Sequence, residues 1–250
     1  MNVLCQALCR FWESSIGKKL IVAITGIVLV GFLVGHMAGN MLVFQGREGM
    51  NDYAAFLHHM LHGAGIWIFR VVLITAFVLH IVATVALTRQ NRAAKAASYE
   101  CDATVQASGS SRIMIWSGLT VLGFVIFHIF HFTIRLNPEL AAMKDPMDPS
   151  RHDVYGMVIA GFQNPLVVLF YIVGVSLLCS HLSHGIASIF QTLGFRSRKS
   201  QDPIKKLGLI ISLILWLGFI SIPVAASFNW ICDSDSESSH SEPVAESAEG

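Results

Sequence analysis

The chain has 250 residues, of which 54% are hydrophobic and only 13% charged, and its formal net charge is +1. A soluble domain carries about 25% charged residues. The composition therefore excludes a disordered chain and a nucleic-acid binder with a basic face, and it disfavours a water-soluble globule. The five cysteines include no CxxC pair, which argues against a disulfide framework or a zinc site. Eleven histidines in so apolar a chain are the unusual feature.

Five stretches are long and apolar enough to cross a membrane, because a span needs about 20 apolar residues. They cover residues 20–44, 66–87, 113–136, 165–193 and 207–228. The sequence therefore predicts an all-α, polytopic membrane protein, a five-helix transmembrane bundle over residues 20–228. Residues 1–19 form a cytoplasmic interfacial segment with an amphipathic helix over 1–16. Residues 229–250 form an acidic, Ser-rich tail that we expect to be disordered.

The lysine and arginine residues are distributed unequally between the two sides of this topology. One side, which includes the N-terminus, holds Arg10, Lys18, Lys19, Arg89, Arg92, Lys95, Arg112, Arg196, Arg198, Lys199, Lys205 and Lys206. The other holds Arg47, Arg135, Lys144 and Arg151, with Arg70 at the edge of the second stretch. Positive residues favour the cytoplasmic side. The sequence thus predicts a protein of the inner (cytoplasmic) membrane with its N-terminus inside and its C-terminus outside.

Six histidines fall within the apolar stretches, where an ionisable side chain indicates function because its burial is costly. At 1.5 Å of helix rise per residue, they separate into two depths. The outer level holds His36 from the first stretch and His128 or His131 from the third. The inner level holds His80 from the second and His181 or His184 from the fourth.

Two facing imidazoles at one depth can ligate a haem iron from both sides, and such a closed iron suits electron transfer. We therefore expect two bis-histidine b-type haems, one above the other, in the core of the bundle. Depth alone leaves His128 against His131, and His181 against His184, undecided. Residues three apart lie on neighbouring faces of one helix.

Several short segments resemble a known family, the five-span, di-haem cytochrome b (b558-type) subunits of succinate dehydrogenases and fumarate reductases. The matching segments are residues 15–19 (SIGKK), 35–40 (GHMAGN), 79–80 (LH), 117–118 (SG), 127–128 (FH), 184–188 (HGIAS) and 191–194 (QTLG). The resemblance covers roughly residues 10–228. It implies that His36 and His128 ligate the outer haem, and that His80 and His184 ligate the inner haem.

The resemblance also implies the partners. A flavoprotein and an iron–sulfur subunit would dock on the cytoplasmic face, and the dicarboxylate chemistry would occur in the flavoprotein. This chain would be the membrane anchor that exchanges electrons with quinone, expected to be menaquinone. By itself it would not catalyse the dicarboxylate reaction.

Charged residues at the expected outer rim are candidates for binding quinone or haem propionates. Glu48, Asp52 and His59 are possible proton-exchanging groups for quinone. Arg70 is the preferred propionate partner, with Arg47 and Arg135 as further outer candidates. The inner candidates are Lys19, Arg89 and Arg112. A simpler interpretation of the three quinone candidates is that they lie on a solvated interfacial helix between the first two apolar stretches.

Two other functions fit the sequence less well. One is the haem b membrane subunit of a nitrate reductase or formate dehydrogenase, which overlaps in span and haem number. The other is a transporter with histidines in a proton or metal path. A transporter would bring its histidines to one site near the middle of the membrane, whereas these histidines divide into two levels.

Overall fold

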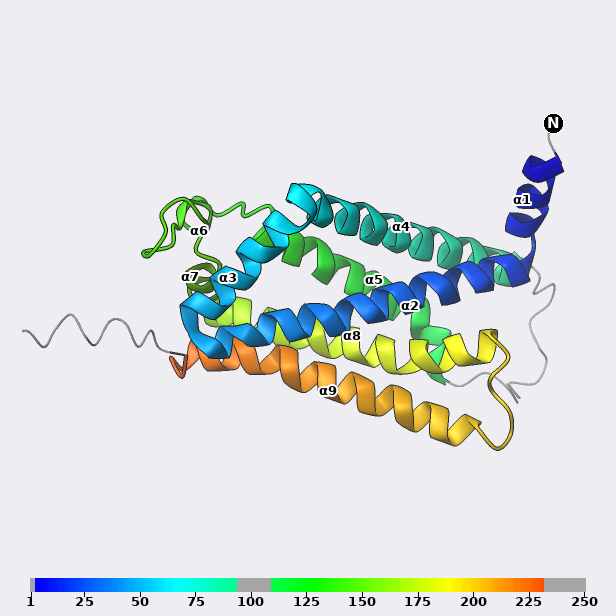
Figure 1. Cartoon of the computed structure of the whole chain (residues 1–250). Helices are drawn as coiled ribbons and strands as arrows, with labels where there is room; N and C mark the ends of the chain where they lie inside the picture. Colours follow the sequence, from blue (N-terminus) through cyan, green and yellow to red (C-terminus); the bar gives the residue numbers. More distant parts are fainter. Residues whose placement is uncertain (1–2, 94–108, 232–250) are drawn as a thin grey trace, which may run out of the picture.

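Figure 1 shows the computed structural model of the chain, in which residues 3–93 and 109–231 are described. This part is helical, and its only β pairing is an isolated bridge between Lys144 and His152. The helices, in order, are α1 (Val3–Glu13), α2 (Ser15–Asn40), η1 (Met41–Gln45), α3 (Gly46–His59), η2 (Met60–Gly63), α4 (Ala64–Ala93), α5 (Gly109–His128), η3 (Ile129–Thr133), α6 (Pro138–Ala142), α7 (Val154–Gly161), α8 (Pro165–Thr192) and α9 (Gln201–Ser227). The predicted all-helical class is confirmed for these residues.

Four helical segments of the described chain are long and apolar enough to cross a membrane. They are Ser15–Ala93, Met114–Thr133, Pro165–Thr192 and Gln201–Ser227. The first is a continuous run of 79 residues that contains α2, α3 and α4. Because α2 and α4 pack side by side, this run doubles back on itself through α3 (Figure 1). The structure thus has the character of a membrane protein.

The long helices form a bundle whose neighbours are clearly defined. Helix α2 packs against α4 on one side and α8 on the other, and α5 packs against α8. Helices α4 and α5 touch only slightly, and α9 lies outside this group against α8 and α2 (Figure 1). In the group formed by α2, α4, α5 and α8, the diagonals are therefore α2 with α5 and α4 with α8.

The two ends of the bundle differ. We call the end that carries α3, α6 and α7 the outer end and the end that carries α1 the inner end (Figure 1). At the inner end the chain turns sharply between α1 and α2, where the Ser14 side chain accepts a hydrogen bond from the Gly17 N–H. A Cβ on Gly17 would lie 2.0 Å from the Phe11 carbonyl oxygen, so the turn requires glycine. Buried Lys18 then donates to the Glu13 carbonyl and to Gln90 of α4.

The predicted segments agree with the helices to within several residues, with two qualifications. The third stretch ends in the π-helical turn η3 rather than continuing as α-helix to residue 136. The acidic tail, expected to be disordered, lies outside the described residues from position 232 on. Most of the polar linker between the second and third stretches also lies outside them, at 94–108.

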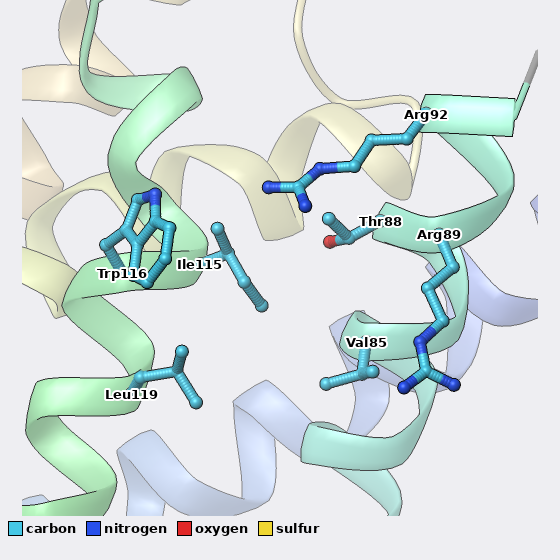
Figure 2. A pocket seen from close by; sticks show the side chains of 7 residues that line it. All are labelled: Val85, Thr88, Arg89, Arg92, Ile115, Trp116 and Leu119. Atoms are coloured by element: carbon cyan, nitrogen blue, oxygen red, sulfur yellow. The ribbon is translucent and has the colours of Figure 1, made fainter.

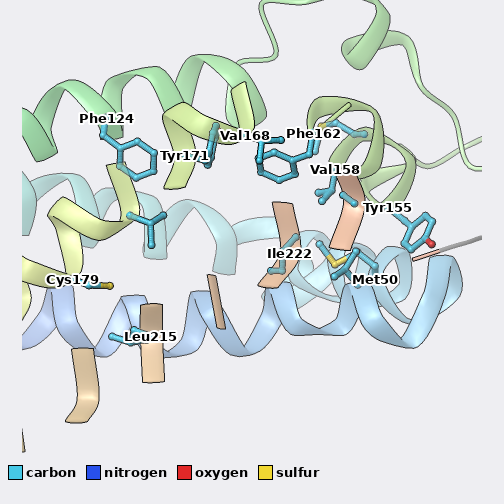
Figure 3. Close-up of a cluster of buried hydrophobic side chains, with 14 of the residues drawn as sticks. Met50, Phe124, Tyr155, Val158, Phe162, Val168, Tyr171, Cys179, Leu215 and Ile222 are labelled. Atoms are coloured by element: carbon cyan, nitrogen blue, oxygen red, sulfur yellow. The ribbon is translucent and has the colours of Figure 1, made fainter. Parts of the chain in front are cut away.

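A buried core joins α5, α7, α8 and α9 near the outer end. Figure 3 shows Phe124, Tyr171 and Phe162 in this cluster, together with Leu215 and Ile222 of α9. The Tyr171 ring packs edge-on against Phe124 at 5.4 Å and against Phe162 at 4.9 Å between centroids. These contacts fix the height of α5 relative to α8.

A polar network holds the outer loop, residues 137–164, against α3. Asn51, which is 1% exposed, donates to Asp145 at 2.8 Å and to Asp153 at 3.0 Å, and its oxygen accepts from the Tyr155 N–H. Asp153 also accepts from Arg47 of α3 and from the Gly156 N–H at the start of α7. Each buried carboxylate thus has several donors, which such groups require.

Asp145 is the most deeply buried charge of this network, at 1% exposed. Burial alone would raise its pKa. Hydrogen bonds from the Met147 N–H, Asn51 and Arg151, with the Arg151 charge, outweigh burial and hold the pKa of Asp145 below its ordinary value. Arg151 in turn reaches Asp52 of α3 at 2.5 Å.

We predict that the outer loop loosens when Asp145 becomes protonated. Because its folded-state pKa is depressed, its contribution is fully present above the ordinary carboxyl pKa of about 4 and is lost as the pH falls below that value. Asp145→Asn should loosen the loop already at neutral pH, at a cost of about 1–3 kcal/mol for the broken buried bonds. Hydrogen exchange of residues 143–153 in detergent measures both effects.

Asp148→Asn provides the matched control, because the exposed Asp148 side chain accepts hydrogen bonds from the N–H and the hydroxyl of Ser150 in its own turn. Equal exchange rates in the two variants would contradict the assigned role of Asp145.

Candidate functional site

Two histidines from opposite helices meet in the outer half of the bundle. The imidazole rings of His36 on α2 and His128 on α5 have centroids 5.8 Å apart and planes inclined at 81°. Both side chains are largely removed from solvent. The His36 ring is supported by stacking on Phe32 at 5.1 Å and by Phe219 of α9 at 5.9 Å. The structure therefore brings together the two histidines that depth assigned to one level.

This contact crosses a diagonal of the bundle. The backbones of α2 and α5 scarcely approach one another, whereas each packs closely on α8. The two imidazoles therefore extend from their helices into the space between α2 and α5. Facing helices of a bundle commonly build cofactor and metal sites in this way.

A single phenol contacts both histidines at the end of α5. The Tyr171 hydroxyl lies 3.3 Å from Nδ1 of His128 and 3.0 Å from Nδ1 of His131. His131 lies within the π-helical turn η3, and π turns occur frequently at functional sites. Of these two histidines, His128 is the one whose ring faces His36.

His80 of α4 is oriented by a hydroxyl from α2. Its Nδ1 lies 3.0 Å from Thr25 Oγ1, and that hydroxyl already donates to the Ile21 carbonyl at 2.7 Å. With its single proton used, the hydroxyl accepts from the His80 Nδ1–H. This tautomer leaves the Nε2 lone pair of His80 available to a metal.

His181 of α8 has the same arrangement with α5. Its Nδ1 lies 3.0 Å from Ser117 Oγ, which donates to the Met114 carbonyl at 2.9 Å. The Nε2 lone pair of His181 is therefore also available.

His184, one turn farther along α8, is placed differently. It is exposed, and among the described residues it makes no side-chain hydrogen bond. It lies within electrostatic range of His181. The structure thus places His181, rather than His184, in contact with a partner helix at the level of His80.

The hydroxyls mark a regular two-level pattern. Thr25 and His36 are eleven residues apart on α2, and Ser117 and His128 are eleven residues apart on α5. Eleven residues make about three helical turns, so each pair lies on one face of its helix. Each of these two helices therefore presents a hydroxyl at the inner level and an imidazole at the outer level, and the levels lie about 16 Å apart along the axis.

A groove opens between α4 and α5 toward the inner end. It has a volume of about 280 Å³ and is lined by Val85, Thr88, Arg89, Arg92, Ile115, Trp116 and Leu119. Figure 2 shows Arg89 and Arg92 on one wall and Trp116 on the other. The lining is mainly apolar, with Thr88 and the two arginines as its polar side chains.

The other predicted site residues do not converge. Glu48 and His59 are exposed on α3, and Asp52 pairs with Arg151. Arg47 is occupied by Asp153, which disfavours it as a propionate partner. Arg70 lies over the Trp67 ring at 4.9 Å, and no carboxylate within residues 3–93 or 109–231 pairs with it. Its expected role as an anion partner remains a prediction.

Three residues of the site, Thr25, Ser117 and Tyr171, were not singled out as functional from the sequence. The eleven-residue spacing was a usable signal for the first two, because it places each on the same face as a histidine. Tyr171 gave no comparable signal, since its role depends on how α8 is turned against α5.

In the described segments 3–93 and 109–231, no group of three or more His, Cys, Asp or Glu side chains is arranged to hold a metal ion. Histidine pairs suit a metal whose other ligands come from a macrocycle. Comparisons of the chain with known protein families, curated proteins and solved structures found no match.

The close approach of α5 to α8 sets the position of His128 against Tyr171, and it depends on Gly174. A Cβ at this position would lie 2.2 Å from Phe124 Cδ2. We predict that Gly174→Ala pushes the helices apart and lowers stability by about 1–3 kcal/mol, as measured by unfolding in detergent.

Gly185→Ala is the control on the same helix, because a Cβ at Gly185 would meet nothing within 4 Å. It should be neutral or stabilising, since alanine favours helix by up to about 1 kcal/mol. A Gly174→Ala variant as stable as Gly185→Ala would show that the Phe124 contact does not set the packing.

Proposed function

We propose that this chain is the membrane-anchor cytochrome b subunit of a succinate:quinone oxidoreductase or fumarate reductase. In this role it holds two bis-histidine b haems that pass electrons between an iron–sulfur subunit and quinone. The observation that carries the proposal is the facing pair His36 and His128 on diagonal helices, with a second histidine level below it. When bound, such haems supply one-electron transfer at a metal closed to substrate.

The outer pair has a spacing that fits ligation of one iron. A metal–imidazole nitrogen bond of about 2.0–2.1 Å on each side implies ring centroids roughly 6 Å apart. The centroids of His36 and His128 are 5.8 Å apart. The two ring planes are inclined at 81°.

The inner pair is supported by the orientation of its rings. His80 and His181 are held through Nδ1 by hydroxyls, which fixes the tautomer that ligates through Nε2. A metal-bound histidine nearly always donates its other N–H in this way. The groove beside α4, with Arg89 and Arg92 at its rim, offers donors for anionic propionates.

For the fourth ligand, the geometry favours His181 over His184, which the family resemblance had suggested. The His181 ring is held by Ser117 of α5, whereas His184 is exposed. We therefore propose His36 with His128 for the outer haem, and His80 with His181 for the inner haem.

The proposed topology has five membrane crossings, by α2, α4, α5, α8 and α9. The basic residues place the N-terminus in the cytoplasm and the C-terminus outside. The flavoprotein and iron–sulfur subunits then dock at the inner end, beside the inner haem. The two levels, about 16 Å apart along the axis, form the electron path toward the outer side.

A haem b subunit of a nitrate reductase or formate dehydrogenase shares the two-level geometry. The segments resembling the succinate dehydrogenase family favour the first assignment. Affinity purification in mild detergent tests the difference, because a flavoprotein and an iron–sulfur protein should accompany the chain. A preparation that carries a molybdenum subunit instead would assign the chain to the alternative. A colourless, folded preparation would eliminate both.

We predict that His36→Ala and His128→Ala each reduce the haem content from two per chain to one, by loss of the same haem. His80→Ala should remove the other. Pyridine haemochrome analysis and redox titration of the purified complex measure content and identity. His58→Ala is the control, because the His58 side chain is exposed on α3, and this variant should retain both haems. Retention of two haems in His36→Ala would refute the outer pair.

We further predict that His181→Ala loses the inner haem and that His184→Ala keeps both. The two variants are matched, because each removes one imidazole from the same region of α8. The opposite result would restore the assignment that the resemblance suggested. Loss of haem in both variants would indicate that His184 supports the site as well.

A further inference from the structure

The Tyr171 hydroxyl has one proton but faces two imidazole nitrogens. Its oxygen lies 3.3 Å from Nδ1 of His128 and 3.0 Å from Nδ1 of His131. A phenol donates one hydrogen bond and accepts others. It must therefore donate to one histidine and accept from the other, so the two histidines take opposite tautomers.

Ligation of the proposed outer haem by His128 would decide which way this chain of hydrogen bonds runs. Because His128 would hold the iron through Nε2, its proton would be on Nδ1 and would be donated to the Tyr171 oxygen. The Tyr171 hydroxyl would then donate to Nδ1 of His131, whose own proton would be on Nε2. In the reverse order His128 would carry its proton on Nε2 and would be unable to bind iron.

The surroundings of Tyr171 make these hydrogen bonds strong. The residue is 5% exposed, and its ring is enclosed by the rings of Phe124, Phe127, Phe132 and Phe162 at centroid distances of 5.4, 6.0, 5.8 and 4.9 Å. Hydrogen bonds in such apolar surroundings are stronger than in water and reinforce one another along a chain.

We propose that Tyr171 is a positioning residue that selects His128 over His131 as the ligand and lowers the reduction potential of the outer haem, with His131 as its acceptor. This inference rests on the proposed function. A hydrogen bond from the ligand's Nδ1–H makes the imidazole a more basic ligand, and a more basic ligand stabilises the ferric state.

The test is the midpoint potential of each haem in the purified complex carrying Tyr171→Phe. Phenylalanine retains the ring packing and removes only the hydroxyl. The outer haem should be retained, and its ferric-to-ferrous equilibrium should shift roughly tenfold toward ferrous, a rise of about 59 mV for a one-electron couple. The inner haem is the internal control and should keep its potential.

A matched control variant is Tyr155→Phe, which removes the hydroxyl of a buried tyrosine that lies on α7 beside Arg47. It should leave the potentials of both haems unchanged. An unchanged or lowered outer potential in Tyr171→Phe, or an equal shift of both haems, would overturn the inference.

The role of His131 is tested by non-additivity. His131→Leu should raise the outer potential less than Tyr171→Phe does, because the hydroxyl then loses its acceptor but still binds His128. If His131 acts only through Tyr171, the double variant should match Tyr171→Phe alone. Loss of the outer haem in His131→Leu would instead make His131 the ligand.

These outcomes separate the inference from the function on which it rests. A wild-type complex without haem refutes the proposed function. A wild-type complex with two haems and a Tyr171→Phe variant of unaltered outer potential refutes the role of Tyr171 alone.

Discussion

The contact between the imidazoles of His36 and His128, across the α2–α5 diagonal of the bundle, is the constraint to which the rest of the bundle is adapted. His36 and His128 meet although α2 and α5 barely touch, so other contacts must hold these two helices apart and in register. Helix α8 does so by packing against both of them, and Gly174 allows its close approach to α5. At the outer end, Asn51 and Asp145 fasten the loop that follows α5 to α3, which follows α2.

Hydroxyl groups solve the problem that neutral imidazoles raise in an apolar bundle. A buried ring N–H without an acceptor costs free energy, yet a carboxylate acceptor would place a charge within the membrane. Thr25 and Ser117 accept from the ring while each donates to a carbonyl of its own helix, so the Nδ1–H of each ring and the hydroxyl proton are both paired. The same bonds select the tautomer with a free Nε2.

The depth of each histidine along its helix could be predicted from the sequence. The direction in which it points around the helix could not. Counting residues was enough to place His36 at the level of His128 and His131, because helix rise is regular, but it did not choose between the last two. The choice between His181 and His184 depends on the rotation of α8, which is set by its packing against residues distant in sequence, such as Phe124 of α5 and Leu215 of α9. The outer network escaped prediction for a similar reason. Asn51 and Asp145 lie 94 residues apart. Nothing in the sequence around Arg47 indicated that it would form an ion pair with Asp153.

The two levels differ in how their histidines are held, and the difference has a functional consequence. At the inner level each hydroxyl serves one imidazole of a neighbouring helix: Thr25 of α2 holds His80 of α4, and Ser117 of α5 holds His181 of α8. At the outer level one phenol on α8 serves two imidazoles on α5, and one of these lies in a π-helical turn. Both levels therefore depend on packing between helices. Loss of one hydroxyl at the inner level would release one ring, whereas loss of the Tyr171 hydroxyl at the outer level would release two.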